Sequence, residues 1–398
     1  MPYRTRNGPI GGVQRVVVHG QSLAGRVYPV TALLLIAGLA LLVIGGEILV
    51  RGAGGLARSF GISPLVVGLT VVSSATSTPE LAVTLQATLA GTPGLAVGNV
   101  VGSNIANVLL VLGLAGLILP LAVRIPVVRR DVPVLIVFSI MLLVLSLGGS
   151  VSRTDGLILA GGLVGYVTWT VLRSRQQELA LARQRAAAAP RPRGLRVPTA
   201  LLLVGIGVAL LVLGARWLVD SASEIAATLG MSDMVVGLTI VAVGTSLPEL
   251  ATSAVAAIRG NVEMAVGNAV GSCTFNIGAV MGLTAALAPG GVPVEQGAIT
   301  FDIPIMIAAA FALLPITFTG LRVARWEAGL FVVLYAAYVT YLLLDAARAG
   351  ALEEYATVML FFVIPLTAVT LMLLAVYELG VIRGRRQVLD GDADPPLA

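Results

Sequence analysis

The sequence contains no lysine, one cysteine and one histidine, and only 11% of its 398 residues are charged. A single cysteine, Cys273, excludes a disulfide bond within the chain. The only histidine, His19, lies outside every long apolar segment. Neither a serine–histidine pair nor a histidine metal site is therefore expected inside a membrane, which argues against an intramembrane enzyme.

Apolar residues dominate what remains. They make up 57% of the chain, far more than a soluble domain of this length could bury. The apolar runs are continuous rather than alternating, which favours helices over strands, so we expect an all-α integral membrane protein of the cell membrane. The runs predict eleven spans, near residues 29–50, 61–89, 95–120, 131–148, 153–173, 198–219, 230–258, 264–288, 299–319, 326–345 and 356–378.

All 25 basic residues are arginine, and their distribution predicts an orientation. If the N-terminus lies outside the cell, 18 of the 25 fall in cytoplasmic segments, as the positive-inside rule requires. Four arginines in the N-terminal tail favour the opposite orientation. We predict an external N-terminus and a cytoplasmic segment at residues 174–197, which is rich in arginine, alanine and proline.

The chain repeats itself at an offset of 169 residues. Residues 45–114 align with residues 214–283 without a gap, and 32 of the 70 pairs are identical. The identities concentrate in short polar motifs rather than in scattered apolar residues: GLTVVSSATSTPEL at 68–81 corresponds to GLTIVAVGTSLPEL at 237–250. Such a pattern indicates duplication of one unit.

Five predicted spans, an odd number, separate equivalent positions. The second copy therefore enters the membrane in the opposite orientation, which predicts two inverted five-helix repeats forming a ten-helix core. An eleventh helix follows. The predicted organisation is a polar tail at 1–28, a first repeat at 29–173, a linker at 174–197, a second repeat at 198–346, and an extra helix with a C-terminal tail at 347–398.

A proline interrupts the second span of each repeat. Pro79 and Pro248 have no amide hydrogen to donate to the carbonyls of Ala75 and Gly244, and their rings crowd the preceding turn. Helices broken within a membrane persist where the freed backbone atoms face protein, water or an ion. A glutamate follows each proline immediately, so the breaks mark a candidate binding site.

Hydroxyl and amide side chains surround both breaks in sequence. On a helix, Thr76 and Ser77 share a face with Glu80, as Thr245 and Ser246 share one with Glu249. The following span of each repeat carries polar residues at every fourth position: Asn99, Ser103 and Asn107, mirrored by Asn268, Ser272 and Asn276. Gly98, Gly102, Gly267 and Gly271 would let these helices approach closely.

The predicted site contains only oxygen ligands and amides. A carboxylate at the centre of a span costs about 2.5 to 3.5 kcal/mol on insertion scales, and no arginine lies near Glu80 or Glu249 in sequence. A bound hard cation such as Ca²⁺ or Na⁺ would offset that free energy, and two carboxylates would balance one divalent charge. The alternative is that both glutamates are protonated packing residues.

These motifs resemble those of the cation/Ca²⁺ exchanger superfamily, in particular its sodium/calcium exchanger branch. The pattern G-T-S-x-P-E followed by G-N-x-x-G-S-N-x-x-N/D occurs as GTSLPE with GNAVGSCTFN, and as ATSTPE with GNVVGSNIAN. The resemblance covers about residues 29–346. It implies two inverted five-helix repeats and exchange of sodium for calcium by alternating access, with the first and sixth helices sliding past the rest.

The resemblance also implies a ligand set. Glu80 and Glu249 would bind the ions, and the backbone carbonyls of Ser73 and Ala242 would join them. The further oxygen ligands would be Thr76, Ser77, Ser103, Asn107, Thr245, Ser246, Ser272 and Asn276. Ca²⁺, Na⁺ and membrane lipid are then the partners, with no cofactor and no nucleic acid, and we expect a monomer, with an oligomer as the alternative.

Four positions depart from the family pattern. Ala75 replaces a glycine, Thr78 replaces an apolar residue, and Cys273 replaces an asparagine. Asn276 stands where many members have aspartate, which leaves two acidic groups in the site and leaves the sodium stoichiometry and the proton sensitivity open.

Two other transport functions compete with sodium-driven exchange. A Ca²⁺/H⁺ antiporter would use the same two carboxylates, each taking up a proton, although the branch that uses protons typically has a different motif in place of G-T-S-x-P-E. A passive channel is the other alternative. One pair of broken helices related by a twofold axis suits a site that can be occluded better than it suits a selectivity filter.

Overall fold

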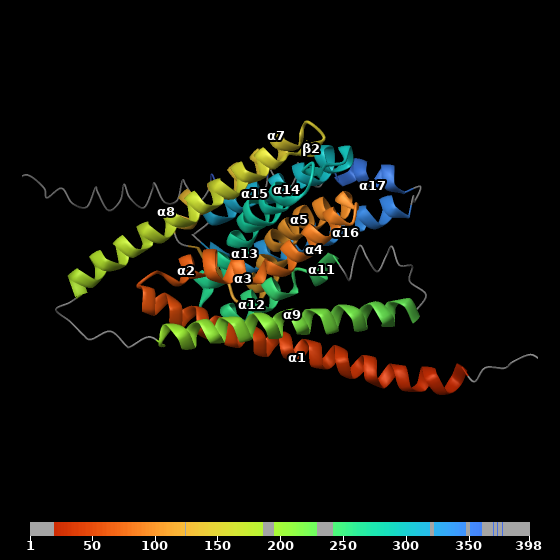
Figure 1. Ribbon diagram of the computed structural model, residues 1–398, viewed down its shortest axis with the longest axis horizontal. Coiled ribbons are helices and arrows are strands. Elements are labelled where there is room, and N and C mark those ends of the chain that lie inside the picture. Colours follow the sequence, from red (N-terminus) through yellow and green to blue (C-terminus); the bar gives the residue numbers. More distant parts are fainter. Residues whose placement is uncertain are drawn as a thin grey trace, which may run out of the picture.

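The computed structural model describes residues 20–123, 125–185, 195–228, 242–318, 322–347 and 351–359, together with residues 369, 372 and 376. The described chain is almost entirely helical (Figure 1). Large apolar side chains are exposed on its outer helices, for example Leu33, Ile36, Val164 and Leu202. Exposed apolar surface of this extent is what lipid, rather than water, requires of a protein surface.

The first half of the described chain contains eight α-helices, separated in places by short π-helical segments and two very short strands. In chain order these are α1 (Gly20–Phe60), α2 (Pro64–Val67), η1 (Gly68–Val72), α3 (Ser73–Thr76), α4 (Thr78–Leu89), α5 (Pro93–Ala106), η2 (Asn107–Val111), α6 (Leu112–Ile118), β1 (Leu121–Ala122), η3 (Val127–Asp131), α7 (Val132–Ser146), β2 (Ser150–Val151) and α8 (Arg153–Arg185).

The described part of the second half repeats this order. It contains α9 (Val197–Thr228), α11 (Ala242–Gly244), α12 (Leu247–Ile258), α13 (Val262–Phe275), η5 (Asn276–Met281), α14 (Gly282–Leu287), β3 (Val292–Pro293), η6 (Ala298–Asp302), α15 (Ile303–Phe318), β4 (Arg322–Val323) and α16 (Arg325–Ala346), followed by α17 (Leu352–Val358). The order agrees with the predicted duplication of one helical unit.

The first helices of the two halves, α1 and α9, lie side by side along one edge of the molecule (Figure 1). A seam of small residues brings their backbones into contact. A methyl group at Gly38 would lie 2.8 Å from the carbonyl oxygen of Gly214, and one at Gly45 would lie 3.0 Å from that of Gly207. Residue numbers rise along α1 as they fall along α9, so the two helices are antiparallel, as equivalent helices of inverted copies should be.

Strand pairing and helix packing join the two halves of the molecule. Strand β1 of the first half pairs antiparallel with β4 of the second, and β2 pairs with β3. Likewise α8 packs on α14, and α16 packs on α6. In the predicted span order each paired strand joins two loops on the same side of the membrane, so the pairing is consistent with that topology.

A tyrosine–aspartate hydrogen bond also occurs in both halves, at positions that the ungapped alignment does not pair. The hydroxyl of Tyr166 on α8 donates to the carboxylate of Asp131 at 2.9 Å, and the hydroxyl of Tyr338 on α16 donates to that of Asp302 at 3.1 Å. Both aspartates end a π-helical segment, η3 or η6. Each bond ties the fourth predicted span of one half to the last span of the same half.

Each of the ten predicted core spans has a described helix within it. Some of these helices are continuous, and others are interrupted or short. Six are long and apolar enough to cross a membrane: Pro29–Phe60, Pro93–Ile118, Arg153–Gln177, Val197–Ala226, Val262–Leu287 and Arg325–Ala346. A bent pair, Pro64–Thr76 with Thr78–Leu89, makes a seventh. Leu247–Ile258 and Ala298–Leu314 are shorter apolar helices. Helix α7, Val132–Ser146, corresponds to the predicted fourth span.

Two predicted boundaries differ from the structure, and two predicted segments lie outside the described residues in whole or in large part. Helix α1 begins at Gly20, within the segment assigned to the polar tail, and α8 continues to Arg185, well into the segment assigned to the linker. The predicted eleventh span at 356–378 and the first part of the seventh, 229–241, lie mostly outside the described residues.

Replacing Gly45 with leucine should destabilise the protein, because the new side chain would collide with the backbone of α9 around Leu211, only 2.9 Å from the first added carbon. We expect a loss of about 1 to 3 kcal/mol, typical of overpacking. Thermal unfolding in detergent measures it. Gly205→Leu on α9 is the matched control, since nothing lies within 4 Å of a methyl group there; equal melting temperatures for the two variants would contradict the seam.

Candidate functional site

Each half contains a helix that is interrupted next to a proline. Helix α3 ends at Thr76, Ser77 has φ −82° and ψ 4°, and α4 starts in a direction bent by 42°. In the second half, Ser246 has φ −90° and ψ 4° between α11 and α12. Pro79 and Pro248 lie in the first turn of the helix that follows, a position where a missing amide hydrogen leaves no bond unmade.

The two glutamates also lie in these first turns. Glu80 belongs to the first turn of α4 and Glu249 to that of α12, and both are fully buried. The amide groups at a helix N-terminus carry partial positive charge, so this position stabilises a carboxylate. The two carboxylates are close enough to repel each other electrostatically, which places the acids of the two halves in one site.

An asparagine fixes each interruption from the neighbouring helix. The side-chain amide of Asn99 on α5 donates to the carbonyl of Glu80 at 3.2 Å and to the Thr84 hydroxyl at 2.9 Å. Asn268 on α13 repeats the arrangement with the Glu249 carbonyl at 3.2 Å and the Ser253 hydroxyl at 2.9 Å. The predicted polar faces of these spans therefore include two residues that position the glutamate-bearing helices.

Hydroxyl groups from both halves meet between the glutamates. The Thr76 hydroxyl lies 3.5 Å from that of Ser272, and the Ser103 hydroxyl lies 3.5 Å from that of Thr245. Thr76, Ser77 and Ser272 surround the carboxylate of Glu249. Since both hydroxyl pairs, and the contacts of Thr76 and Ser77 with Glu249, join one half to the other, the complete site exists only when the two halves are packed together.

The remaining predicted amide ligands lie at π-helical turns. Asn107 opens η2 and Asn276 opens η5, both at equivalent positions of the repeat and both fully buried. A π-helical turn inserts one residue into a helix and is frequent at functional sites. The two asparagines are thus buried at equivalent π-helical turns, a local geometry that the sequence pattern alone did not predict.

Many of the buried polar atoms of the site have no hydrogen-bond partner within the described chain. They include both carboxylate oxygens of both glutamates and the side-chain oxygen and nitrogen of both asparagines at the π-helical turns, with two serine hydroxyls: Ser77, Glu80, Asn107, Ser246, Glu249 and Asn276. These six residues form three equivalent pairs, each 169 positions apart. Buried polar groups without partners are rare in folded proteins, and each requires an explanation.

Two further predicted ligands are backbone carbonyls, those of Ser73 and Ala242. The Ser73 hydroxyl donates to the carbonyls of Gly68 at 2.7 Å and Asn268 at 3.0 Å, which locks α3 onto α13. The Ser73 carbonyl accepts the amide of Ser77 at 2.9 Å and the hydroxyl of Thr76 at 3.4 Å. Ala242 is the first residue of α11 and borders the segment outside the described residues.

Cys273 occupies the position equivalent to Asn104, and the two meet. The thiol of Cys273 on α13 donates to the carbonyl oxygen of Asn104 on α5 at 3.6 Å. The Asn104 amide nitrogen contacts the sulfur of Met306 at 3.3 Å. The cysteine that departs from the family pattern is therefore a buried packing residue at the contact between the halves.

The chemistry of the site favours a hard cation. Its lining consists of carboxylate, hydroxyl and amide groups, and within the described ranges no third acid, histidine or cysteine joins the two glutamates in a metal-binding cluster. Oxygen ligands of this kind suit Ca²⁺ or Na⁺ rather than zinc or copper. The arrangement can hold a desolvated cation between the two halves.

Comparison with known proteins gives consistent matches. A family model described as sodium/calcium exchanger protein matches residues 30–172 and 199–344. Inner membrane protein YrbG of Escherichia coli is 40% identical over 285 residues, covering 71% of this chain and 87% of that protein. Sodium/calcium exchanger MaX1 of Methanosarcina acetivorans is 31% identical over 346 residues, covering 79% of this chain and 98% of that one.

Solved structures give the same result. The sodium-calcium exchanger NCX_Mj, soaked with 2.5 mM Na⁺ and 0.1 mM Ca²⁺, matches with a TM-score of 0.66 at 31% identity. The match covers 78% of this chain and 98% of that one, so the membrane transporter fold extends over nearly the whole of the known structure.

Replacing Asn99 or Asn268 with alanine should destabilise the protein by similar amounts, because each variant loses two equivalent hydrogen bonds, one to a backbone carbonyl and one to a hydroxyl. We expect about 1 to 3 kcal/mol for each. Thermal unfolding in detergent measures the loss. Ser74→Ala is the control, since the exposed Ser74 hydroxyl bonds only to the carbonyl of Val71 within its own helix; a large effect at one asparagine and none at the other would contradict the equivalence of the two sites.

Proposed function

Because the chain belongs to the sodium/calcium exchanger family, we propose that it exchanges Na⁺ for Ca²⁺ across the cell membrane by alternating access, with Glu80 and Glu249 binding both ions. The observation that carries this proposal is the symmetric set of buried polar atoms without partners in the described chain, centred on these two acids. A cation bound there would give the carboxylate, hydroxyl and amide oxygens the partner that they lack.

The charge of the site explains why the two ions would compete. Two carboxylates without a basic partner carry two negative charges, which one Ca²⁺ or two Na⁺ ions neutralise. Excess charge in a buried site is strongly unfavourable, so binding of one ion would displace the other. Exchange rather than joint transport follows from that competition.

The ligands beyond the glutamates come from both halves. The hydroxyls of Thr76, Ser77 and Ser272 lie around Glu249, and those of Ser103 and Thr245 lie together on the other side of the same interface. Small movements of one half against the other would open this set of ligands. The site is therefore suited to bind an ion tightly in one arrangement and release it in another.

The antiparallel pair α1 and α9 is the moving part in this proposal. Its internal seam brings the two backbones together through glycines such as Gly38 and Gly45, so the pair would move as one unit. Its contacts with the remaining bundle include α12, which carries Glu249. Sliding of the pair would expose the site alternately to the two sides of the membrane, with the N-terminus outside and the linker at 174–197 in the cytoplasm.

Neutralising either acid should abolish exchange. We expect Glu80→Gln and Glu249→Gln each to weaken Ca²⁺ binding by about 10² to 10⁴, which is the effect of removing one partner from a buried ionic cluster at about 3 to 5 kcal/mol. Calcium flux in proteoliposomes with an imposed sodium gradient measures it. Asp220→Asn, at a carboxylate whose side chain is 68% exposed, is the control and should transport normally; full exchange by the double glutamine variant would refute the site.

The coupling ion is tested separately. A Ca²⁺/H⁺ antiporter could use the same buried pair, each carboxylate taking up one proton when Ca²⁺ leaves. Everted vesicles loaded with sodium should take up Ca²⁺ in proportion to the sodium gradient at constant pH. Uptake driven by a pH gradient in sodium-free medium, with none driven by sodium, would assign the chain to proton exchange instead.

A further inference from the structure

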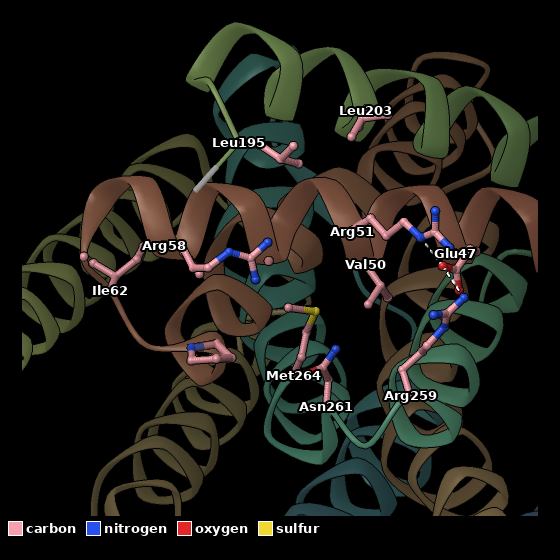
Figure 2. A pocket seen from close by; sticks show the side chains of 14 residues that line it. Glu47, Val50, Arg51, Arg58, Ile62, Leu195, Leu203, Arg259, Asn261 and Met264 are labelled. Carbon is pink, nitrogen blue, oxygen red and sulfur yellow. Dashed lines mark hydrogen bonds and ion pairs between the residues drawn. The ribbon is translucent and has the colours of Figure 1, made fainter. Parts of the chain in front are cut away.

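A pocket unrelated to the glutamate site lies at one end of α1. It has a volume of about 840 Å³ and is formed by the last turns of α1, the start of α2, the residues that lead into α9, and the turn between α12 and α13 (Figure 2). It therefore borders both the α1 and α9 pair and the bundle that holds the glutamates. In the orientation proposed above it opens at the cytoplasmic end of the spans.

Three arginines line this pocket, and one acid partly neutralises them. Glu47 forms ion pairs with Arg51, four residues further along α1, and with Arg259 at the end of α12, the latter at 2.5 Å. Figure 2 shows the three side chains meeting at one end of the pocket, with Arg58 at the other end. Arg58 has no ion pair within the described chain, so the lining carries two excess positive charges.

The rest of the lining is largely apolar. Val50, Ile62, Leu195, Leu203 and Met264 contribute to its walls. Figure 2 shows Arg58 and Arg51 projecting from α1, with Leu195 and Leu203 on the segment above it and Met264 below. A ligand that fits this combination has an anionic group and an apolar body.

We propose that this pocket binds an anionic phospholipid, with its phosphate at Arg58 and the upper part of an acyl chain along the apolar wall. Arginine binds phosphate through charge-assisted hydrogen bonds, and basic pockets between membrane helices on the cytoplasmic side are suited to anionic headgroups. A free phosphate would leave the apolar wall exposed, and a zwitterionic lipid would leave the excess positive charge uncompensated.

The position of the pocket gives such a lipid a second effect. Because its walls belong both to α1 and to the turn after α12, a bound lipid would contact the moving pair and the static bundle at once. This consequence rests on the proposed function, whereas the binding itself does not.

The binding is tested on the purified full-length chain in neutral detergent. Native mass spectrometry would compare phosphatidylglycerol with phosphatidylcholine of identical acyl chains. We expect preferential binding of phosphatidylglycerol, weakened about fivefold by Arg58→Gln, since one arginine near an anionic headgroup is worth about that factor. Arg216→Gln, at a 78% exposed side chain near the far end of α9, should bind as the wild type does.

A second variant separates charge recognition from a structural role. Glu47→Gln removes the acid that neutralises Arg51 and Arg259, so phosphatidylglycerol should bind more tightly, in the opposite direction to Arg58→Gln. Weaker binding by both variants would mean that the ion pairs only maintain the fold, and would overturn the proposal.

Equal binding of the two lipids, or competition by glycerol phosphate as effective as by phosphatidylglycerol, would overturn it too. None of these readouts requires transport. A chain that fails to exchange sodium for calcium but still distinguishes the two lipids would therefore refute the proposed function alone.

Discussion

The burial of two carboxylates at the ends of two interrupted helices constrains the rest of this structure. An unpaired carboxylate is strongly disfavoured in an apolar interior, and here two lie fully buried and near each other. The helix N-termini supply partial positive charge. The side-chain amides of Asn99 and Asn268 fix the backbone at the glutamates by donating to the carbonyls of Glu80 and Glu249. In the proposed function a cation bound between the acids would compensate this charge, with the hydroxyl and amide groups around them as further oxygen ligands.

The packing of the two halves follows from this requirement. A site made of residues from both copies needs the copies to be held together and yet able to move. The short strand pairs β1 with β4 and β2 with β3 connect the halves, in the predicted topology one pair on each side of the membrane. Between them, α1 and α9 make backbone contact through glycines and pack closely against each other. In the proposed function this pair moves as one unit against the rest of the bundle.

Much of this arrangement could be predicted from the sequence, because duplication makes the informative residues stand out. The offset of 169 residues identifies the glutamates, the prolines and the polar faces together, and an odd number of spans predicts their inversion. Contacts that depend on the path of the chain could not be predicted. Nothing in the sequence links Glu47 to Arg259, and the Asp131 and Asp302 pairs with tyrosine are hidden because the loops before them differ in length. The start of α1 at Gly20 was missed because polar residues can extend a helix beyond the apolar run.

The contact between Asn104 and Cys273 illustrates what joining two copies in one polypeptide permits. These are equivalent positions of the two sequence repeats, and the thiol of one contacts the backbone carbonyl of the other. In a homodimer of half-length subunits, both positions would carry the same residue, and any substitution at one would also be present at the other. In a single chain that restriction is absent, so position 104 can carry an amide and position 273 a thiol. The two sides of this contact between the repeats can therefore differ in their chemistry.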